Sequence, residues 1–259
     1  MQLYRCVSKP KQKDFSASYS TTINGEIQKG SCASMFYMNT TLNSPVIIGN
    51  NVTSCAYMFQ NCSAYNQDIS IPDSVENCSG MFFGCHVLNK NIAFPDNASC
   101  DEAFAYCYNL NQNIKIPANT SNCYRMFEMC SALNRNIEIP SNATHCGRMF
   151  YGCNNLNQNF VIPKKVTNCY QMFDSCYKLM GKNIYINGNP NCASMLNKKN
   201  WTGSGWTGRL NVFCNNISVL NKTTAADSIV GSSIAWTSTT NGYYNAYYNL
   251  YIYKNYVGT

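Results

Sequence analysis

Residues 123–140 read CYRMFEMCSALNRNIEIP, and close variants of this stretch recur along most of the chain. Equivalents of its first Cys stand 22 or 23 residues apart, and a second Cys follows seven residues after most of them. The first series is Cys32, Cys55, Cys78, Cys100, Cys123, Cys146, Cys169 and Cys192. The second series is Cys62, Cys85, Cys107, Cys130, Cys153 and Cys176. A fixed period of this length indicates a solenoid, in which each repeat forms one coil.

Apolar residues also hold fixed positions within the repeat. Met and Phe follow the first Cys by three and four residues, as in Met126-Phe127, and Leu follows the second Cys by three. Two apolar residues then flank an outward residue before Pro, as in the segment 137–140. This alternation predicts a short strand with one buried face, which Pro ends. The spacing between Cys, Met, Phe and the next Cys predicts one or two helical turns.

These elements predict a repeat solenoid over residues 31–197, with about seven repeats of 22–23 residues. The expected form is a coil with short parallel strands and helical turns. One coil cannot bury its own apolar side chains, so coils must stack and equivalent residues form ladders. The Asn after Leu is expected to turn into the coil and bond main-chain groups at the bend. These residues are Asn43, Asn66, Asn89, Asn111, Asn134 and Asn157.

The chain has 16 Cys, of which 14 belong to the two series and only Cys6 and Cys214 do not. So many Cys usually indicate the disulfide framework of a secreted protein. The regular spacing favours a different interpretation, in which the ladder Cys are reduced thiols that fill the core. Disulfides between stacked Cys and metal binding are the alternatives. The seven-residue spacing differs from the paired Cys of zinc sites, so no metal site is predicted.

The solenoid is flanked by two segments of different composition. Residues 1–30 are expected to form an N-terminal cap or an anchoring arm, with a hairpin at Asn24-Gly25. Residues 198–259 are expected to form a small antiparallel β domain rich in Tyr and Asn. Such residues suit adaptable binding surfaces, although alternate Tyr would also pack a sheet over the end of the solenoid. The candidate surface-binding residues are Trp201, Trp206, Tyr243, Tyr244, Tyr247, Tyr251 and Tyr253.

Residues suited to catalysis are scarce. The two His, His86 and His145, each adjoin a ladder Cys, but adjacent residues seldom face each other. No phosphate loop, nucleophile elbow or zinc motif is present, so neither catalytic residues nor a cofactor is expected. Charged residues make up 12% of the chain, and the net charge of +7 is spread along it. A nucleic-acid-binding protein would carry a dense basic stripe, and no apolar run is long enough for a membrane span.

The repeat resembles the BspA-type leucine-rich repeat and the related Met-Phe-Asn-Gln repeat of bacterial surface proteins. The likeness is carried by Met58-Phe59 with Asn66-Gln67-Asp68-Ile69, by Met149-Phe150 with Asn157-Gln158-Asn159-Phe160, and by Ile162-Pro163 through Cys169. Such repeats occur on host-associated bacteria, in protist surface proteins and in phage virion proteins. The resemblance implies a leucine-rich-repeat-like right-handed coil. It also implies binding, often adhesion, without shared catalytic residues.

The beginning of the chain lacks the apolar segment of a secretory signal peptide. With the resemblance, this favours a phage virion protein, a tail fibre or other appendage assembled in the host cytoplasm and used for host attachment. Its expected partners are other virion proteins, held through the N-terminal arm or the C-terminal domain, and a host cell-surface glycan or protein as receptor. Appendage proteins of this kind often form homo-oligomers. The alternatives are a bacterial surface adhesin and a purely architectural virion subunit, such as a head-decoration or baseplate protein.

Overall fold

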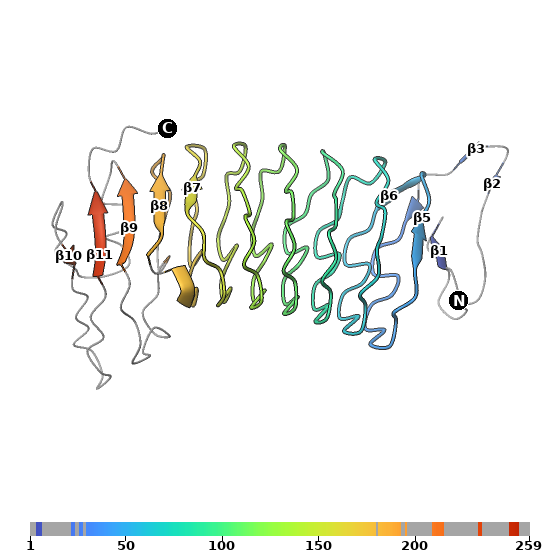
Figure 1. Ribbon diagram of the computed structural model, residues 1–259. Coiled ribbons are helices and arrows are strands. Elements are labelled where there is room, and N and C mark those ends of the chain that lie inside the picture. Colours follow the sequence, from blue (N-terminus) through green and yellow to red (C-terminus); the bar gives the residue numbers. More distant parts are fainter. Residues whose placement is uncertain are drawn as a thin grey trace.

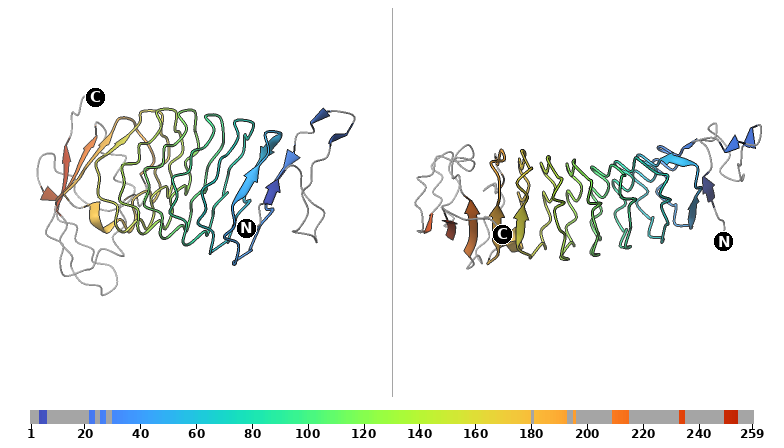
Figure 2. Two further views of the ribbon diagram at one scale, coloured as in Figure 1. Left: turned by 45° about the vertical axis from the view of Figure 1, so that its right-hand side comes forward. Right: turned by 90° about the horizontal axis from the view of Figure 1, so that it is seen from above.

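The computed structural model describes residues 30–179, 181–192 and 195, and the backbones of six short strands outside that range. These strands are β1 (Tyr4–Cys6), β2 (Thr22–Ile23), β3 (Glu26–Ile27), β9 (Arg209–Cys214), β10 (Ser233–Ile234) and β11 (Asn249–Tyr253). The repeats form coils that stack in a single row, and the row makes a rod (Figures 1 and 2). The predicted repeat solenoid is confirmed.

The predicted apolar-x-apolar segments lie on one flank of the rod. This flank contains β5 (Val46–Ile48), β7 (Phe160–Ile162) and β8 (Asn183–Ile186). β1 pairs parallel with β5, and β7, β8, β9 and β11 pair parallel in that order. Their inward residues are buried, as in the alternating pattern of β7. In the middle repeats the equivalent segments 92–94, 114–116 and 137–139 form no strand, so this part of the prediction is wrong.

A second flank precedes the first Cys of each repeat. β4 (Gly30–Ser31) pairs parallel with β6 (Val52–Ser54). Single-residue parallel bridges continue the pairing along the rod. They join Ser54 to Asn77, Asn77 to Ser99, Asn122 to His145, His145 to Asn168, and Asn168 to Asn191. At the N-terminal side, β2 and β3 pair antiparallel, which is the pairing of a hairpin.

The segment between the two Cys of a repeat is a series of tight turns, and the predicted helical turns are wrong. The described residues contain only one short helix, the 3₁₀ helix η1 (Tyr177–Leu179). Arg125 and Met129, two and six residues after Cys123, have φ values of 52° and 62°. Positive φ at the third residue of a turn is typical of type II turns and cannot occur inside an α-helix.

Hydrogen bonding explains why turns replace the helix. Alternate N–H groups bond within the turns, as from Met126 to the Cys123 carbonyl at 3.2 Å. The N–H groups between them bond to the next coil, as from Phe127 to the Met149 carbonyl at 2.9 Å. A helix would direct every N–H along its own axis and leave the neighbouring coil unbonded. The turns therefore make a parallel ladder that fixes the stacking of the coils.

The core of the rod is a ladder of Phe rings. Neighbouring rings stack with centroids 5.4–5.8 Å apart and interplanar angles of 2–17°. Met, Leu and Ile of the repeat surround this ladder and are buried. The ladder consists of Phe36, Phe59, Phe82, Phe104, Phe127, Phe150 and Phe173. Each ring from Phe59 to Phe150 is therefore packed by a Phe in the coil before and a Phe in the coil after.

The two Cys series form buried ladders of thiols. Thirteen ladder Cys are free and buried, which confirms the prediction for them. Each thiol of the second series donates to the carbonyl of a Phe in the preceding coil, as from Cys130 to Phe104 at 3.1 Å. Cys32 is the exception, because it is disulfide-bonded. It lies in the first coil, where no earlier repeat supplies a ladder neighbour, and its partner lies outside the described side chains.

The Asn after Leu bonds main-chain groups as expected, but the predicted interior environment is wrong. The side-chain oxygen of Asn66 accepts from the N–H of Asn89 at 3.0 Å, and that of Asn111 accepts from Asn134 at 2.9 Å. Asn89 and Asn134 are nevertheless exposed. The amide lies at the corner of the coil, where it ties one coil to the next while one side of it faces solvent.

The C-terminal strands differ from the expected antiparallel domain. β9 pairs parallel with β8 and thereby extends the flank sheet of the solenoid. β11 pairs parallel with β9, and only β10 and β11 pair antiparallel. Strands are present in the expected segment, but their pairing was predicted wrongly because local patterns mark strands without specifying which neighbour each one meets.

Candidate functional site

The turn segments present one face of the rod to solvent, and aromatic side chains gather on this turn face. Each projects from a residue one, two, five, six or eight positions after the first Cys of a repeat, on either side of the buried Met-Phe pair. Tyr37 is 50% exposed and Tyr170 is 41% exposed, and the others are partly exposed. The aromatic side chains of the turn face are Tyr37, Tyr57, Phe83, Tyr106, Tyr108, Tyr124, Tyr151, Tyr170 and Tyr177.

Ring contacts make this face continuous across neighbouring coils. Phe83 and Tyr106 lie 5.1 Å apart between centroids, and Tyr108 meets Tyr106 edge-on at 6.3 Å. Tyr124 stacks on His145 at 5.1 Å with an interplanar angle of 5°. Such contacts add about 0.5–1.5 kcal/mol each beyond the area that they bury. The aromatic residues therefore form a preorganised surface.

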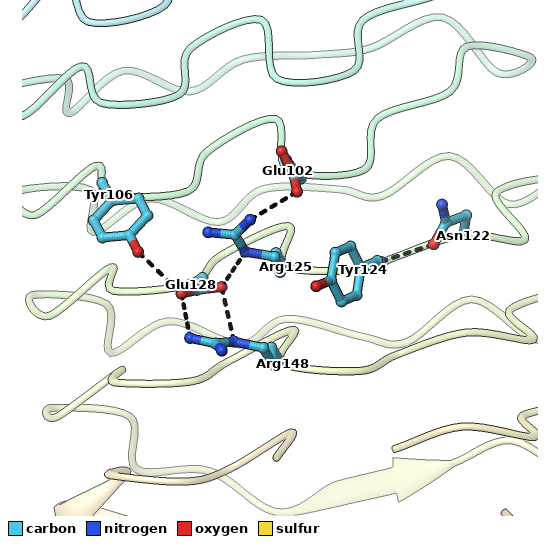
Figure 3. A network of polar contacts seen from close by, with 7 residues as sticks. All are labelled: Glu102, Tyr106, Asn122, Tyr124, Arg125, Glu128 and Arg148. Carbon is cyan, nitrogen blue, oxygen red and sulfur yellow. Dashed lines mark hydrogen bonds and ion pairs between the residues drawn. The ribbon is translucent and has the colours of Figure 1, made fainter. Parts of the chain in front are cut away.

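A charge cluster lies among these rings (Figure 3). Its centre is Glu128, whose carboxylate is fully buried. Arg148 donates to it from Nη2 at 2.7 Å and from Nε at 3.2 Å, and the Nε of Arg125 donates to it from the same coil. Tyr106 donates its hydroxyl to the same carboxylate at 3.2 Å. Arg125 also donates to Glu102 at 3.0 Å, so one chain of polar contacts crosses three coils.

The two guanidinium groups are held in place by rings as well as by carboxylates. Arg148 lies over the ring of Tyr151 at 4.3 Å from its centroid, and Arg125 lies 5.9 Å from both Phe83 and Tyr124. Each Arg is about a quarter exposed. The two positive charges are balanced by Glu102 and Glu128. The cluster is therefore a rigid and electrically neutral part of the turn face, with guanidinium edges at the surface.

The thiols near this face are unsuited to nucleophilic chemistry. Burial raises the pKa of Cys55, Cys62 and Cys100 to about 12. Cys146 is in the core, whereas the ring of the adjacent His145 stacks on Tyr124 at the surface. Burial also lowers the pKa of His145. A thiolate nucleophile needs the opposite conditions, a lowered thiol pKa and an imidazole within reach.

The described residues offer no metal site. No group of three or more His, Cys, Asp or Glu in this part of the chain is arranged to hold an ion. The same residues contain no helix with the length and apolar character needed to cross a membrane.

The binding residues predicted from the sequence lie outside the described side chains. The backbones of Tyr251 and Tyr253 belong to β11, and nothing further is described for them. The others are Trp201, Trp206, Tyr243, Tyr244 and Tyr247, all outside the described residues. Sequence reasoning missed the turn face because it attended to the repeated positions. The variable positions next to the first Cys, where Tyr and Arg recur, were the signal that could have found it.

Comparison with known proteins identifies the repeat. A model of the BspA type leucine rich repeat region matches residues 29–148 and 55–180, in 6 copies. The chain belongs to the BspA-type leucine-rich repeat family. The resemblance carried by the Met-Phe and Asn-Gln motifs is thereby confirmed.

One solved structure is similar to this BspA-type chain. It is a leucine-rich repeat protein from Bacteroides ovatus, 20% identical over 61% of this chain, with a TM-score of 0.30. The match spans 58% of the Bacteroides protein. None of the curated proteins matches this chain.

Proposed function

We propose that this chain is a non-enzymatic adhesion protein whose turn face binds a macromolecule on a cell surface. The observation that carries the proposal is the continuous row of Tyr, Phe and Arg side chains, preorganised by stacking and by the buried Glu128. Tyr and Arg are the residues that most often dominate binding energy at protein surfaces. Preorganisation reduces the entropy lost when such side chains are immobilised. Membership of a repeat family found on cell surfaces supports the same role.

Binding of the purified protein to target cells tests this proposal. The double variant Tyr124→Ala/Tyr170→Ala removes two rings from the turn face. We expect cell binding to weaken by about tenfold or more, because central aromatic residues contribute most to such contacts. Ile47→Ala, an exposed position in β5 on the strand flank, is the control and should leave binding unchanged. Equal binding by the double variant and the parent protein, with both folded by circular dichroism, would refute the role of this face.

The proposed carrier of the protein is a phage particle, in which it would serve as a tail fibre or other host-attachment appendage. The thirteen free thiols favour this carrier over a secreted bacterial adhesin. Virion proteins fold in the reducing cytoplasm, where thiols persist, whereas secreted proteins fold where disulfides form. Mass spectrometry of purified virions and of bacterial envelope fractions separates the two. Recovery only from envelopes would leave the adhesion role intact and assign it to a bacterial surface protein.

A further inference from the structure

A groove runs across three coils on the strand flank, on a different surface from the turn face. It consists of two adjoining depressions of about 520 and 690 Å³, which share Asn136, Glu138, Ile139 and Ser141. The first lies between segments 114–116 and 137–139, and the second lies between segment 137–139 and β7. We call this feature the strand-flank groove.

Main-chain groups are left open along the groove. β7 and β8 pair residue by residue, from Phe160 with Ile184 to Ile162 with Ile186. Among the described residues, no main-chain hydrogen bond joins segment 114–116 to segment 137–139, or segment 137–139 to β7. Unpaired main-chain donors and acceptors of an extended segment can pair with another polypeptide. The groove therefore offers hydrogen-bonding capacity that the chain itself does not use.

The side chain of Gln158 already bonds to one residue of the groove and indicates which ligand groups would fit there. Gln158 accepts from the N–H of Ile137 at 3.0 Å and donates to the carbonyl of the same residue at 2.8 Å. Its carboxamide thus supplies a donor and an acceptor side by side, as a peptide group in a neighbouring strand would. The equivalent residue one coil earlier, Arg135, donates instead to the carbonyl of Asn111, so the depression beside segment 114–116 has no such carboxamide.

Two further features of the groove specify the occupant. The side-chain oxygen of Asn187 is buried at its edge and has no hydrogen-bond partner among the described residues, so an N–H donor from a ligand would satisfy it. Lys115, Lys164 and Lys165 line the groove against a single carboxylate, that of Glu138. An excess of positive charge favours an acidic ligand.

We propose that the strand-flank groove binds an extended acidic peptide of a partner protein. Peptide groups of the ligand pair with open main-chain groups of segment 114–116 and of residues 138–139, while Ile137 keeps its bonds to Gln158. They also supply an N–H to Asn187. Carboxylates of the ligand face Lys164 and Lys165. The groove and the turn face are separate surfaces, so this interaction does not depend on the adhesion role proposed above.

Fluorescence anisotropy with a labelled decapeptide of alternating Asp and Thr tests the proposal on the full chain. We expect saturable binding. A decapeptide methylated at alternate peptide nitrogens keeps its charge but loses main-chain donors, and we expect its affinity to fall by about tenfold or more. Equal affinity of the two peptides, or no binding of the unmethylated peptide, would overturn the proposal.

Charge reversal in the groove gives a second, independent readout. The double variant Lys164→Glu/Lys165→Glu should bind the acidic peptide about tenfold more weakly, because the carboxylates of the peptide then face the negative charges of the two Glu. The double variant Lys178→Glu/Lys182→Glu is the matched control, because it changes the net charge by the same amount at two Lys that do not line the groove. Equal losses in both variants would reduce the effect to net charge and contradict the groove. Unfolding temperatures of all variants establish that each is folded.

Discussion

Glu128 is the residue on which the geometry of the turn face depends most. Its buried carboxylate accepts hydrogen bonds from Arg125, Arg148 and Tyr106, which come from three successive coils. A buried carboxylate is stabilising only where its lone pairs are satisfied and its charge is compensated, and both conditions hold here. Removing it would leave two guanidinium groups beside each other without the charge that holds them.

The variant Glu128→Gln tests this dependence with little change in volume. We expect the free energy of unfolding to fall by about 2 kcal/mol, less than for a fully buried pair because both Arg side chains are partly exposed and regain water. Glu138→Gln, an exposed carboxylate, should change it by no more than about 0.5 kcal/mol. Urea denaturation followed by circular dichroism measures both. Similar small values for the two variants would show that Glu128 contributes no more than a surface carboxylate.

At the scale of the element, the tandem turns depend on residues that tolerate positive φ. Gly80 has a φ of +58°, and a Cβ added there would lie 2.1 Å from Cε1 of Tyr57 in the preceding coil. The Tyr57 ring therefore covers the space that a side chain would take. Other coils have Arg125 and Arg148 at the same turn position and accept the cost of positive φ for a non-Gly residue.

Gly80→Ala should destabilise the rod by about 2–3 kcal/mol, because left-handed backbone strain adds to displacement of the Tyr57 ring. Gly181→Ala is the matched comparison, since Gly181 also has positive φ but has no atom within 4 Å of an added Cβ. We expect a cost of about 1 kcal/mol there, from backbone strain alone. Thermal or urea unfolding compares the two. Equal costs would mean that the Tyr57 ring moves away freely.

The Phe ladder is the second element that can be tested. Phe127 stacks between Phe104 and Phe150 at 5.7 Å on each side. Phe127→Ala should lower the free energy of unfolding by about 3–5 kcal/mol. Lys164→Ala, an exposed position, should change it by no more than about 0.5 kcal/mol. A small effect of both substitutions in urea denaturation would contradict a core built on this ladder.

We expect the stability of the whole rod to fall at alkaline pH, because its thiols are collectively buried. Burial raises the pKa of Cys55, Cys62 and Cys100 from 9.0 to about 12, and it raises that of most other ladder thiols as well. The folded chain therefore keeps protons that the unfolded chain loses once the pH exceeds 9. The free energy of unfolding stays constant well below that pH and falls as the pH rises from 9 toward 12.

Each such thiol lowers the free energy of unfolding by about 1.4 kcal/mol per pH unit within this window. The losses of unfolding free energy from several thiols add up to more than the 5–15 kcal/mol that stabilises a typical domain. We therefore expect cooperative unfolding near about pH 10. Circular dichroism and thiolate absorbance, recorded together in reducing buffer, should change at the same pH. Thiolate formation near pH 9 with the rod still folded would contradict the buried ladders.

The periodic Cys, Met, Phe and Leu by themselves determined the solenoid, because one coil cannot bury these residues and stacked coils can. The same period correctly indicated buried free thiols, as at Cys123 and Cys130. Periodicity could not distinguish helical turns from tandem turns. Both satisfy a spacing of three and four residues, and the choice depends on N–H groups that bond to the next coil.

Only the tertiary structure decided which variable residues meet. Glu102, Arg125 and Arg148 are 23 residues apart in sequence and become neighbours because each coil advances the rod by one ladder step. The stacking of the coils also decided where main-chain hydrogen bonds form on the strand flank. β7 and β8 are paired, whereas no main-chain hydrogen bond joins segments 114–116 and 137–139. Local sequence is nearly the same in both places. Pairing depends on contacts between coils: beside β7, the Gln158 side chain takes both main-chain groups of Ile137, and no local pattern specifies that contact.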